Sequence, residues 1–315
     1  MSALEELLKD VTAGDPITGI KWMRKTLRKV TVELQGQGFP VEHETVRRLI
    51  REAGYRLRVN RKRLTKKHNP DRDRQMRYVA RQRARYVKLG RPVISVDGKK
   101  RELVGNFKNA GRTWRKSAVN VFEKDFPTDA VGVALPYGIY DVANNRGFVV
   151  VGISHQTAAF AVNAVRTWWV ALGKALFPNQ HKLLIEADAG GANASNSWLW
   201  KWELQKLAND FGLTITVTHL PTGASKWNPI EHRMFSEISS NWAGEPLVSY
   251  EVILNYIRTT RTEQGFQCQA HLDTAEYKTK LKVTPEQKTL VNLKPHRVLS
   301  KWNYTIKPSS AAIRN

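Results

Sequence analysis

Residues 183–191 read Leu-Leu-Ile-Glu-Ala-Asp-Ala-Gly-Gly, and this stretch decides the fold. Its apolar first half predicts a buried strand, which ends on Asp188 before a glycine-rich turn. A second β-branched run, at residues 93–96, also ends on an acid, Asp97. A side chain just past the carboxyl end of a strand faces the crevice where α/β sheets bind ligands. The two aspartates are therefore expected to meet at one edge of a sheet.

The chain around these two strands alternates between strand-like and helix-like patterns. The expected elements are strands at residues 139–142, 148–153 and 214–220 and helices at residues 157–176 and 197–211. Residues 103–107 can return as the hairpin partner of the strand at residues 93–97. A last helix is opened by Asn228-Pro229, because proline is favoured at the first helical position. This order predicts a mixed α/β sheet.

Glu231 is a third acid that can reach the same sheet edge. It lies on the first turn of the helix opened by Asn228-Pro229, so it can join Asp97 and Asp188. Three carboxylates at one place suit Mg²⁺ or Mn²⁺, because these ions prefer oxygen ligands and substrate phosphates. The three acids therefore predict metal-assisted phosphoryl chemistry.

Each of these acids also has a structural alternative. Asp97 and Asp188 stand before glycines, so either can be a turn residue. Asn228 and Glu231 have the spacing of a capping box, in which the glutamate side chain binds the backbone of the cap. Glu186 remains a rival metal ligand. Other nearby titratable residues are left outside the metal site: His219, His232 and Asp141.

The charge of the chain favours a polyanionic partner. Its 315 residues carry 51 Lys and Arg against 28 Asp and Glu, a net charge of +23, which argues against an enzyme of neutral metabolites. Residues 1–90 hold 23 of the basic residues and 10 of the acidic ones, so the excess is concentrated there. This distribution is typical of nucleic-acid binding.

Cysteine usage and hydropathy indicate the compartment. Cys268 is the only cysteine, so the chain can form neither an internal disulfide nor a cysteine-based zinc site. The first ten residues are acidic, and no apolar run approaches the roughly 18 to 20 residues of a membrane helix. We expect a soluble cytoplasmic protein without a membrane partner.

Residues 1–65 are expected to form a helix-turn-helix. The first helix is predicted after Asp15-Pro16 by apolar residues at helical spacing: Ile20, Met23, Leu27, Val30 and Leu34. A glycine-containing turn separates it from a second helix at about residues 42–53. The expected DNA contacts lie on the outer face of that helix and in the basic run after it: Arg47, Arg48, Arg51, Arg58, Arg61, Lys62 and Arg63. A plain helical hairpin with a solvated basic face would show the same patterns.

Three further regions follow this DNA-binding region. Residues 66–91 are expected to be a basic helical linker, residues 92–262 the catalytic domain, and residues 263–315 a basic C-terminal extension. The extension can be a contact to DNA or to a partner, or a solvated tail. Its basic residues include Lys278, Lys280, Lys282, Lys294 and Arg297.

Several motifs closely resemble those of the Rhodopirellula-type DDE transposases of bacterial insertion sequences. The most specific is Ser-Lys-Trp-Asn-Pro-Ile-Glu-His-Arg at residues 225–233, and Ala-Asp-Ala-Gly-Gly-Ala-Asn at residues 187–193 is another. The resemblance continues in residues 137–141, 157–162, 60–64 and 241–244, and it runs from about Gly14 to Lys294. Family members tend to be longer ahead of Gly14, which implies a shortened N-terminal region in this copy.

The resemblance implies a fold, an activity and a set of partners. It implies an RNase H-like catalytic core, distantly similar to Tc1/mariner transposases, preceded by an all-α helix-turn-helix region. Asp97, Asp188 and Glu231 would hold two Mg²⁺ or Mn²⁺ ions. Beyond the resemblance, the positive charges of Lys226 and Arg233 near Glu231 lead us to expect that both contact phosphates. The partners would be double-stranded DNA, as terminal inverted repeats and as target, and further copies of the chain on that DNA.

The sequence thus predicts an insertion-sequence transposase that binds terminal repeats, cleaves DNA in a metal-dependent reaction and transfers strands. Two alternatives stay open. One is a decayed or truncated transposase that acts only as a helix-turn-helix DNA-binding protein. The other is a nuclease with the same metal core, which cuts strands and never joins them.

Overall fold

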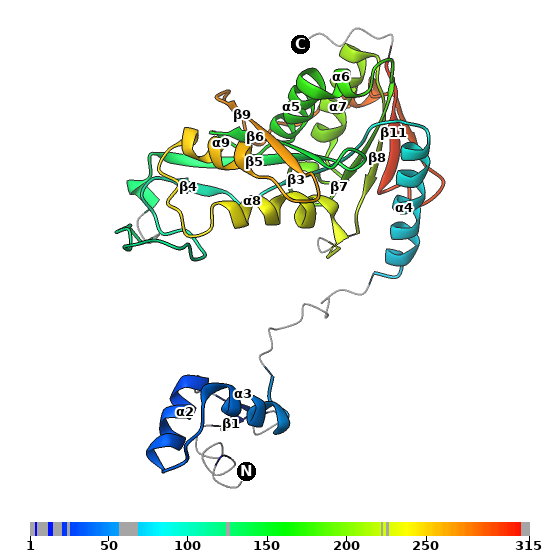
Figure 1. Ribbon diagram of the computed structural model, residues 1–315. Coiled ribbons are helices and arrows are strands. Elements are labelled where there is room, and N and C mark those ends of the chain that lie inside the picture. The colour runs from blue at the N-terminus through cyan, green and yellow to red at the C-terminus, as the bar shows by residue number, and fades with distance from the viewer. Residues whose placement is uncertain are drawn as a thin grey trace. The chain divides into compact units, whose positions relative to one another are not determined.

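The computed structural model describes most of the chain. The described residues are 4, 12–14, 21–23, 26–56, 69–123, 127–221, 223–224 and 227–309. The chain divides into two compact units, Met1–Thr65 and Lys66–Asn315 (Figure 1). Among the described residues, no helix has the length and apolar character to span a membrane.

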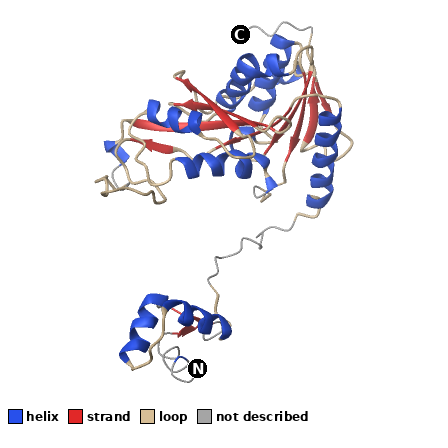
Figure 2. Cartoon of the chain, in the orientation of Figure 1, coloured by secondary structure: helices blue, strands red, loops and turns tan. Residues whose placement is uncertain are grey.

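The second unit is built on a nine-stranded mixed sheet, whose strands are red in Figure 2. The strands are β3 (Val93–Gly98), β4 (Glu102–Val104), β5 (Gly132–Asp141), β6 (Arg146–Gly152), β7 (Lys182–Ala187), β8 (Thr214–His219), β9 (Gln267–Asp273), β10 (Leu293–Pro295) and β11 (Asn303–Ile306). Their order is β10-β11-β8-β7-β3-β5-β6-β9, and β4 pairs with β5.

Five central strands define the fold class. In the order β6-β5-β3-β7-β8, β5 is antiparallel to both β6 and β3, and β3, β7 and β8 run parallel to one another. Both faces of these strands are covered, so their sequences are almost continuously apolar. This order and these directions are those of an RNase H-like core, which confirms the predicted fold class.

Helices cover both faces of the sheet (Figure 1). One face packs against α5 (Ala158–Trp168), its continuation through a π-type turn (Trp169–Gly173) into α6 (Lys174–Leu176), and α7 (Trp198–Phe211). The other face packs against α4 (Arg72–Lys88), the π-type turn η5 (Glu231–Phe235) with α8 (Ser236–Asn241), and α9 (Tyr250–Thr259). A short helix, α10 (Pro285–Thr289), precedes β10.

Local sequence signals explain where the main helices begin. Thr157 and Ser197 accept hydrogen bonds from the third residues of α5 and α7, which caps both helices. Gly212 ends α7 in the left-handed conformation (φ 63°), which glycine adopts without a steric penalty. Trp168 and Trp200 are fully buried beneath these helices, and burial of one such side chain stabilises the fold by roughly 2–3 kcal/mol.

The described part of the first unit includes the helices α2 (Leu27–Gly36) and α3 (His43–Glu52), and α3 agrees with the predicted second helix. The start of the first helix differs from the prediction. Thr26 caps α2, and Met23 belongs to strand β2 (Lys21–Met23), which pairs with β1 (Thr12–Gly14). The Thr26 hydroxyl supplies a cap six residues after Ile20, the first residue of the apolar stripe. The unit therefore holds a two-stranded sheet besides its helices.

Three predictions about the second unit are corrected. Residues 103–107 do not pair with β3, because β5 and β7 occupy both of its edges, and β4 pairs with β5 instead. The predicted linker at residues 66–91 is largely α4, which packs on the sheet through Tyr86. The predicted extension at residues 263–315 supplies β9, β10 and β11 to the two sheet edges.

Candidate active site

Asp97 lies inside the central strand β3, where it pairs with Gly138 of β5. It is therefore a strand residue, and the turn alternative is wrong. Its carboxylate accepts hydrogen bonds from the backbone N–H of Gly98 (2.8 Å) and from the Asn228 amide (3.1 Å). Burial, with added repulsion from Asp188 and Glu231, raises the pKa of Asp97 to about 8.

Asn228 connects the first acid to the helix that carries the third. Its side chain is fully buried, donates to Asp97 Oδ2 and accepts a hydrogen bond from Ser95 Oγ (2.6 Å). Its backbone carbonyl accepts from the N–H of Glu231 (3.2 Å). Because the side chain is bound to β3, the structure does not support the capping-box alternative for Glu231.

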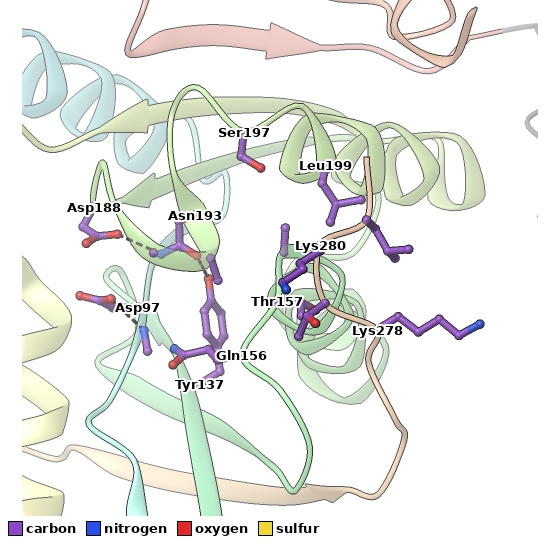
Figure 3. Close-up of a pocket in the computed structure, with 17 residues that line it drawn as sticks. Asp97, Tyr137, Gln156, Thr157, Asp188, Asn193, Ser197, Leu199, Lys278 and Lys280 are labelled. Atoms are coloured by element: carbon purple, nitrogen blue, oxygen red, sulfur yellow. Dashed lines mark hydrogen bonds between the residues drawn. The ribbon is translucent and has the colours of Figure 1, made fainter. Parts of the chain in front are cut away.

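Asp188 follows β7, which is parallel to β3, so both aspartates come to the same end of the sheet (Figure 3). Asn193 donates to Asp188 Oδ1 (3.2 Å), and the Tyr137 hydroxyl donates to Asn193 Oδ1 (2.5 Å). Burial raises the pKa of Asp188 and Glu231 adds to it, while Asn193 and the backbone of Gly190 oppose the rise. The two aspartates thus share one arrangement, in which an oriented asparagine amide holds each carboxylate.

His219 supports Asp188 from behind. Its Nδ1 lies 2.8 Å from the carbonyl oxygen of Asp188, and its Nε2 lies 3.2 Å from the hydroxyl of Tyr304. A carbonyl only accepts, so Nδ1 carries the proton and Nε2 accepts from Tyr304. Trp200 Nε1 donates to the same hydroxyl (3.0 Å). Burial lowers the pKa of His219 to about 4, so the ring is neutral and structural.

Glu231 is the first residue of η5 and is half-buried. Its charge raises the pKa values of Asp97 and Asp188, which places the three acids in one electrostatic cluster. Its charge also opposes the fall that burial causes in the pKa of Lys99. The Lys99 ammonium is 3.4 Å from Glu102 and 4.7 Å from the centre of the Trp242 ring.

A divalent cation suits this donor set. Mutual repulsion contributes to the raised pKa of Asp97, and a cation among the acids would remove that repulsion. The donors are carboxylate oxygens, the ligands that Mg²⁺ and Mn²⁺ prefer. Within the described residues, no three His, Cys, Asp or Glu side chains are already gathered tightly enough to hold a metal ion. Assignment of the three acids as ligands therefore stays a prediction.

The remaining acids have other partners. Glu186, the rival ligand, is fully buried and bound by the guanidinium of Arg83, with contacts between 2.5 and 3.1 Å. Asp141 is buried at the opposite end of β5, where it accepts from the backbone and side chain of Asn144. Both acids are structural.

A cavity of about 600 Å³ opens beside the two aspartates (Figure 3). Asp97, Asp188 and the Gly190-Gly191 turn line one side, and Gln156 and Thr157 line another. Gly98 leaves room for the Gln156 amide, because a Cβ at residue 98 would meet Gln156 Nε2 at 1.6 Å. The acids thus face a space large enough for a small ligand or part of a polymer.

The structure describes only some of the predicted DNA contacts. Arg48 and Arg51 are exposed on α3 and Arg47 is half-buried there, and two of them pair with acids of the same helix, Arg47 with Glu44 and Arg48 with Glu52. Arg233 is exposed on η5. The other predicted contacts lie outside the described residues: Arg58, Arg61, Lys62, Arg63 and Lys226.

Asn193, Asn228, His219 and Tyr137 support the acids, a role that sequence reasoning did not predict for any of them. The two asparagines carry a usable signal, because one follows Asp188 by five residues and the other precedes Glu231 by three. His219 and Tyr137 carry no such sequence signal. They come close to the acids only because their strands, β8 and β5, pair with β7 and β3.

An RNase H-like sheet with acids at the ends of its central parallel strands defines a class, the DDE-type polynucleotidyl transferases. Comparison with protein families then gives the particular family. The Rhodopirellula transposase DDE domain matches residues 3–308, nearly the whole chain, and the protein belongs to this family. It is a DDE transposase, an enzyme of DNA recombination.

Several solved structures of the Mos1 transposase are similar to the chain. One is the Mos1 paired-end complex with the left transposon end, at 14% identity, with 81% of this chain and 68% of that chain covered and a TM-score of 0.44. Another is the Mos1 mariner paired-end complex with Mn, at 15% identity, 81% and 69% coverage and a TM-score of 0.42. No curated protein matches the sequence.

Proposed function

We propose that this chain binds the terminal repeats of its element, cleaves DNA at the element ends and joins those ends to target DNA. The observation that carries the proposal is that Asp97 and Asp188 come to the same end of two neighbouring parallel strands, and that Asn228 joins Asp97 to the start of the π-type turn that carries Glu231. Clustered carboxylates beside an open cavity are the arrangement that metal-assisted phosphoryl transfer requires.

Asp97, Asp188 and Glu231 would hold two Mg²⁺ or Mn²⁺ ions. Bound ions of this kind activate an oxygen nucleophile and stabilise the leaving oxygen of a phosphodiester. Asp97, on the central strand β3, would be one of the residues that hold these ions. Its high pKa means that binding of the cations is coupled to loss of a proton from its carboxyl group.

The protein's own residues orient the reaction. Asn228 and Asn193 hold the two aspartate carboxylates, and the fixed hydroxyls of Ser95 and Tyr137 orient the amides. No covalent protein nucleophile is needed, because water and then a DNA 3′-hydroxyl serve as nucleophiles. The cavity beside the acids would receive the DNA strand that reacts.

DNA recognition and assembly are the second part of the proposal. The net charge of +23 and the arginines of α3 support binding of double-stranded DNA, as terminal repeat and as target. Two element ends must be held together for transposition, so the chain would act as a homo-oligomer on DNA. It would work in the cytoplasm, on the chromosome.

A gel assay tests the chemistry. Purified protein is incubated with Mg²⁺ or Mn²⁺ and labelled DNA that carries the repeats flanking the element, with the Asp188→Asn variant in parallel. We expect metal-dependent cuts at the 3′ ends together with joined products, and neither with the variant. Cuts without joined products would identify a nuclease, and binding without either would identify a decayed transposase.

A further inference from the structure

One wall of the cavity comes from residues 278–281, a segment far in sequence from the three acids. Lys278 and Lys280 lie on this wall, opposite the side formed by Asp97 and Asp188. We propose that these two lysines bind backbone phosphates of the DNA strand that reaches the acids. This inference rests on the proposed function. It states which part of the DNA lies against this wall of the cavity, namely the phosphate backbone of the reacting strand.

The segment is anchored immediately before the lysines, at Tyr277. The Tyr277 hydroxyl donates to Asp273 Oδ2 (2.6 Å) and accepts from the Asn163 amide (2.9 Å). Its backbone N–H donates to Ser154 Oγ (3.1 Å), and its ring packs edge-on against Phe160, with 5.4 Å between ring centres. Contacts from β9, α5 and the loop after β6 therefore fix the position of Tyr277, from which the segment with the two lysines starts.

The lysines themselves are available to a ligand. Both are exposed, and no ion pair joins either of them to an acid among the described residues. Lys280 adopts a left-handed backbone conformation (φ 59°), which costs free energy for a residue with a Cβ. In Figure 3 its side chain lies over Thr157 and its amine points toward the side of Asp188 and Asn193, while Lys278 extends away from them.

This distribution of charge suits a nucleic-acid strand. The acids at one end would hold cations at the reacting phosphate, where free ammonium groups would compete with them. Phosphates farther along the strand carry charge that no cation neutralises, and each lysine in reach of one releases counterions. Lys280 would thus bind a phosphate near the acids, and Lys278 one farther along the strand.

Thiol crosslinking tests the position of the strand. Cys268 is buried and burial raises the pKa of its thiol, so a cysteine introduced on the segment is the reactive one. Lys280→Cys, Lys278→Cys and Lys282→Cys variants are mixed with terminal-repeat DNA whose backbone carries an activated disulfide near the 3′ end. The protein thiolate attacks that disulfide and expels the small thiol, which leaves a protein–DNA disulfide.

Lys282 is the matched control, because it is an exposed lysine of the same segment that does not line the cavity. We expect crosslinks for Lys280→Cys and Lys278→Cys at least tenfold faster than for Lys282→Cys. Equal rates for the three variants, or no crosslink from Lys280→Cys under conditions where gel shift shows bound DNA, would overturn the inference.

Charge removal provides a second measurement. The Lys278→Ala/Lys280→Ala double variant is compared with Lys282→Ala/Lys294→Ala, which loses the same charge from exposed positions off the cavity. We expect the first pair to weaken DNA binding about tenfold more than the second and to lower the salt slope of binding by about 1.8, at 0.9 for each neutralised phosphate. Equal effects of the two pairs would contradict specific contacts.

These outcomes separate the inference from the proposed function. Crosslinking at Lys280 without metal-dependent cleavage by the unaltered protein would keep the strand contact and reject the chemistry. Cleavage by the unaltered protein without crosslinking at Lys280 would keep the chemistry and reject the strand contact.

Discussion

At the scale of single residues, the acids of the candidate active site lower the stability of the folded protein. Asp97 is largely withdrawn from water, yet its neighbours are two further acids, and its pKa rises to about 8 as a result. The folded protein therefore holds a proton on Asp97 that the unfolded chain releases at a much lower pH. Between these two pKa values, a rise in pH destabilises the fold, because the unfolded state binds fewer protons.

We therefore predict that Asp97→Asn raises the melting temperature of the metal-free protein by several degrees. The gain should be larger at pH 8 than at pH 5, because Asp97 is mostly protonated in the fold at pH 5. Differential scanning calorimetry in EDTA measures both values. Saturating Mg²⁺ should reduce or reverse the gain, since it stabilises only a protein that binds it. An equal gain at both pH values would contradict this explanation.

Asn228 leads to a second prediction at this scale. Asn228→Ala removes a hydrogen bond to Asp97, so we expect cleavage to slow by about 10–100-fold, the usual cost of losing a residue that orients a metal ligand. DNA binding should stay unchanged, and the Mg²⁺ concentration for half-maximal rate should rise.

Ser95→Ala is the matched control for Asn228→Ala. It leaves the Asn228 amide in place and removes only the hydroxyl that orients it, so its effect should be smaller. Cleavage rates measured over a Mg²⁺ titration compare the two variants. A larger effect of Ser95→Ala would show that the amide is not the group that holds Asp97.

At the scale of elements, one ion pair joins α4 to the central sheet. Arg83 of α4 binds Glu186 of β7, whose side chain has no exposed surface. Gln75 of the same helix is also buried and donates to the carbonyl of His219 (2.8 Å) and to Asn303 (2.8 Å). The helix predicted as a linker is thus fixed to the strands that support Asp188.

Arg83→Leu should destabilise the second unit by about 3 kcal/mol, because it leaves the Glu186 carboxylate buried without its counter-charge. The Arg83→Leu/Glu186→Leu double variant should recover most of that loss, since neither charge remains. Urea unfolding followed by tryptophan fluorescence measures both. If the double variant had a lower free energy of unfolding than Arg83→Leu, the prediction would be wrong. The attraction between Arg83 and Glu186 would then outweigh the free-energy cost of burying the two charges.

At the scale of the whole molecule, the arginines of α3 and the acids of the candidate active site lie in different units. The acids proposed to be catalytic belong to Lys66–Asn315, whereas the predicted helix-turn-helix arginines belong to Met1–Thr65. Changes to one function should therefore leave the other measurable.

We predict that Arg47→Ala/Arg48→Ala/Arg51→Ala weakens binding to terminal-repeat DNA and lowers the salt slope by about 2–3, at 0.9 for each phosphate that an arginine no longer neutralises. The melting of the second unit should not change. Fluorescence anisotropy across a salt series measures the slope. An unchanged slope would remove α3 from the DNA-binding surface and favour the plain helical hairpin.

The sequence by itself determined the central strands, the helices that alternate with them and two of the acids that end strands. These features are local, because apolar runs, caps and glycine turns act over a few residues. The specific motif at residues 225–233 also allowed Glu231 to be predicted with them, and the family confirms the class of enzyme.

Only the tertiary structure decided which strands pair and which residues support the acids. β9, β10 and β11 join the two sheet edges from a region that resembles a basic tail, because strand pairing depends on contacts distant in sequence. The Asn228 amide meets Asp97, 131 residues away in sequence, for the same reason. Hydrogen bonds between side chains on different elements leave no periodic pattern in a sequence, so only the folded chain reveals them.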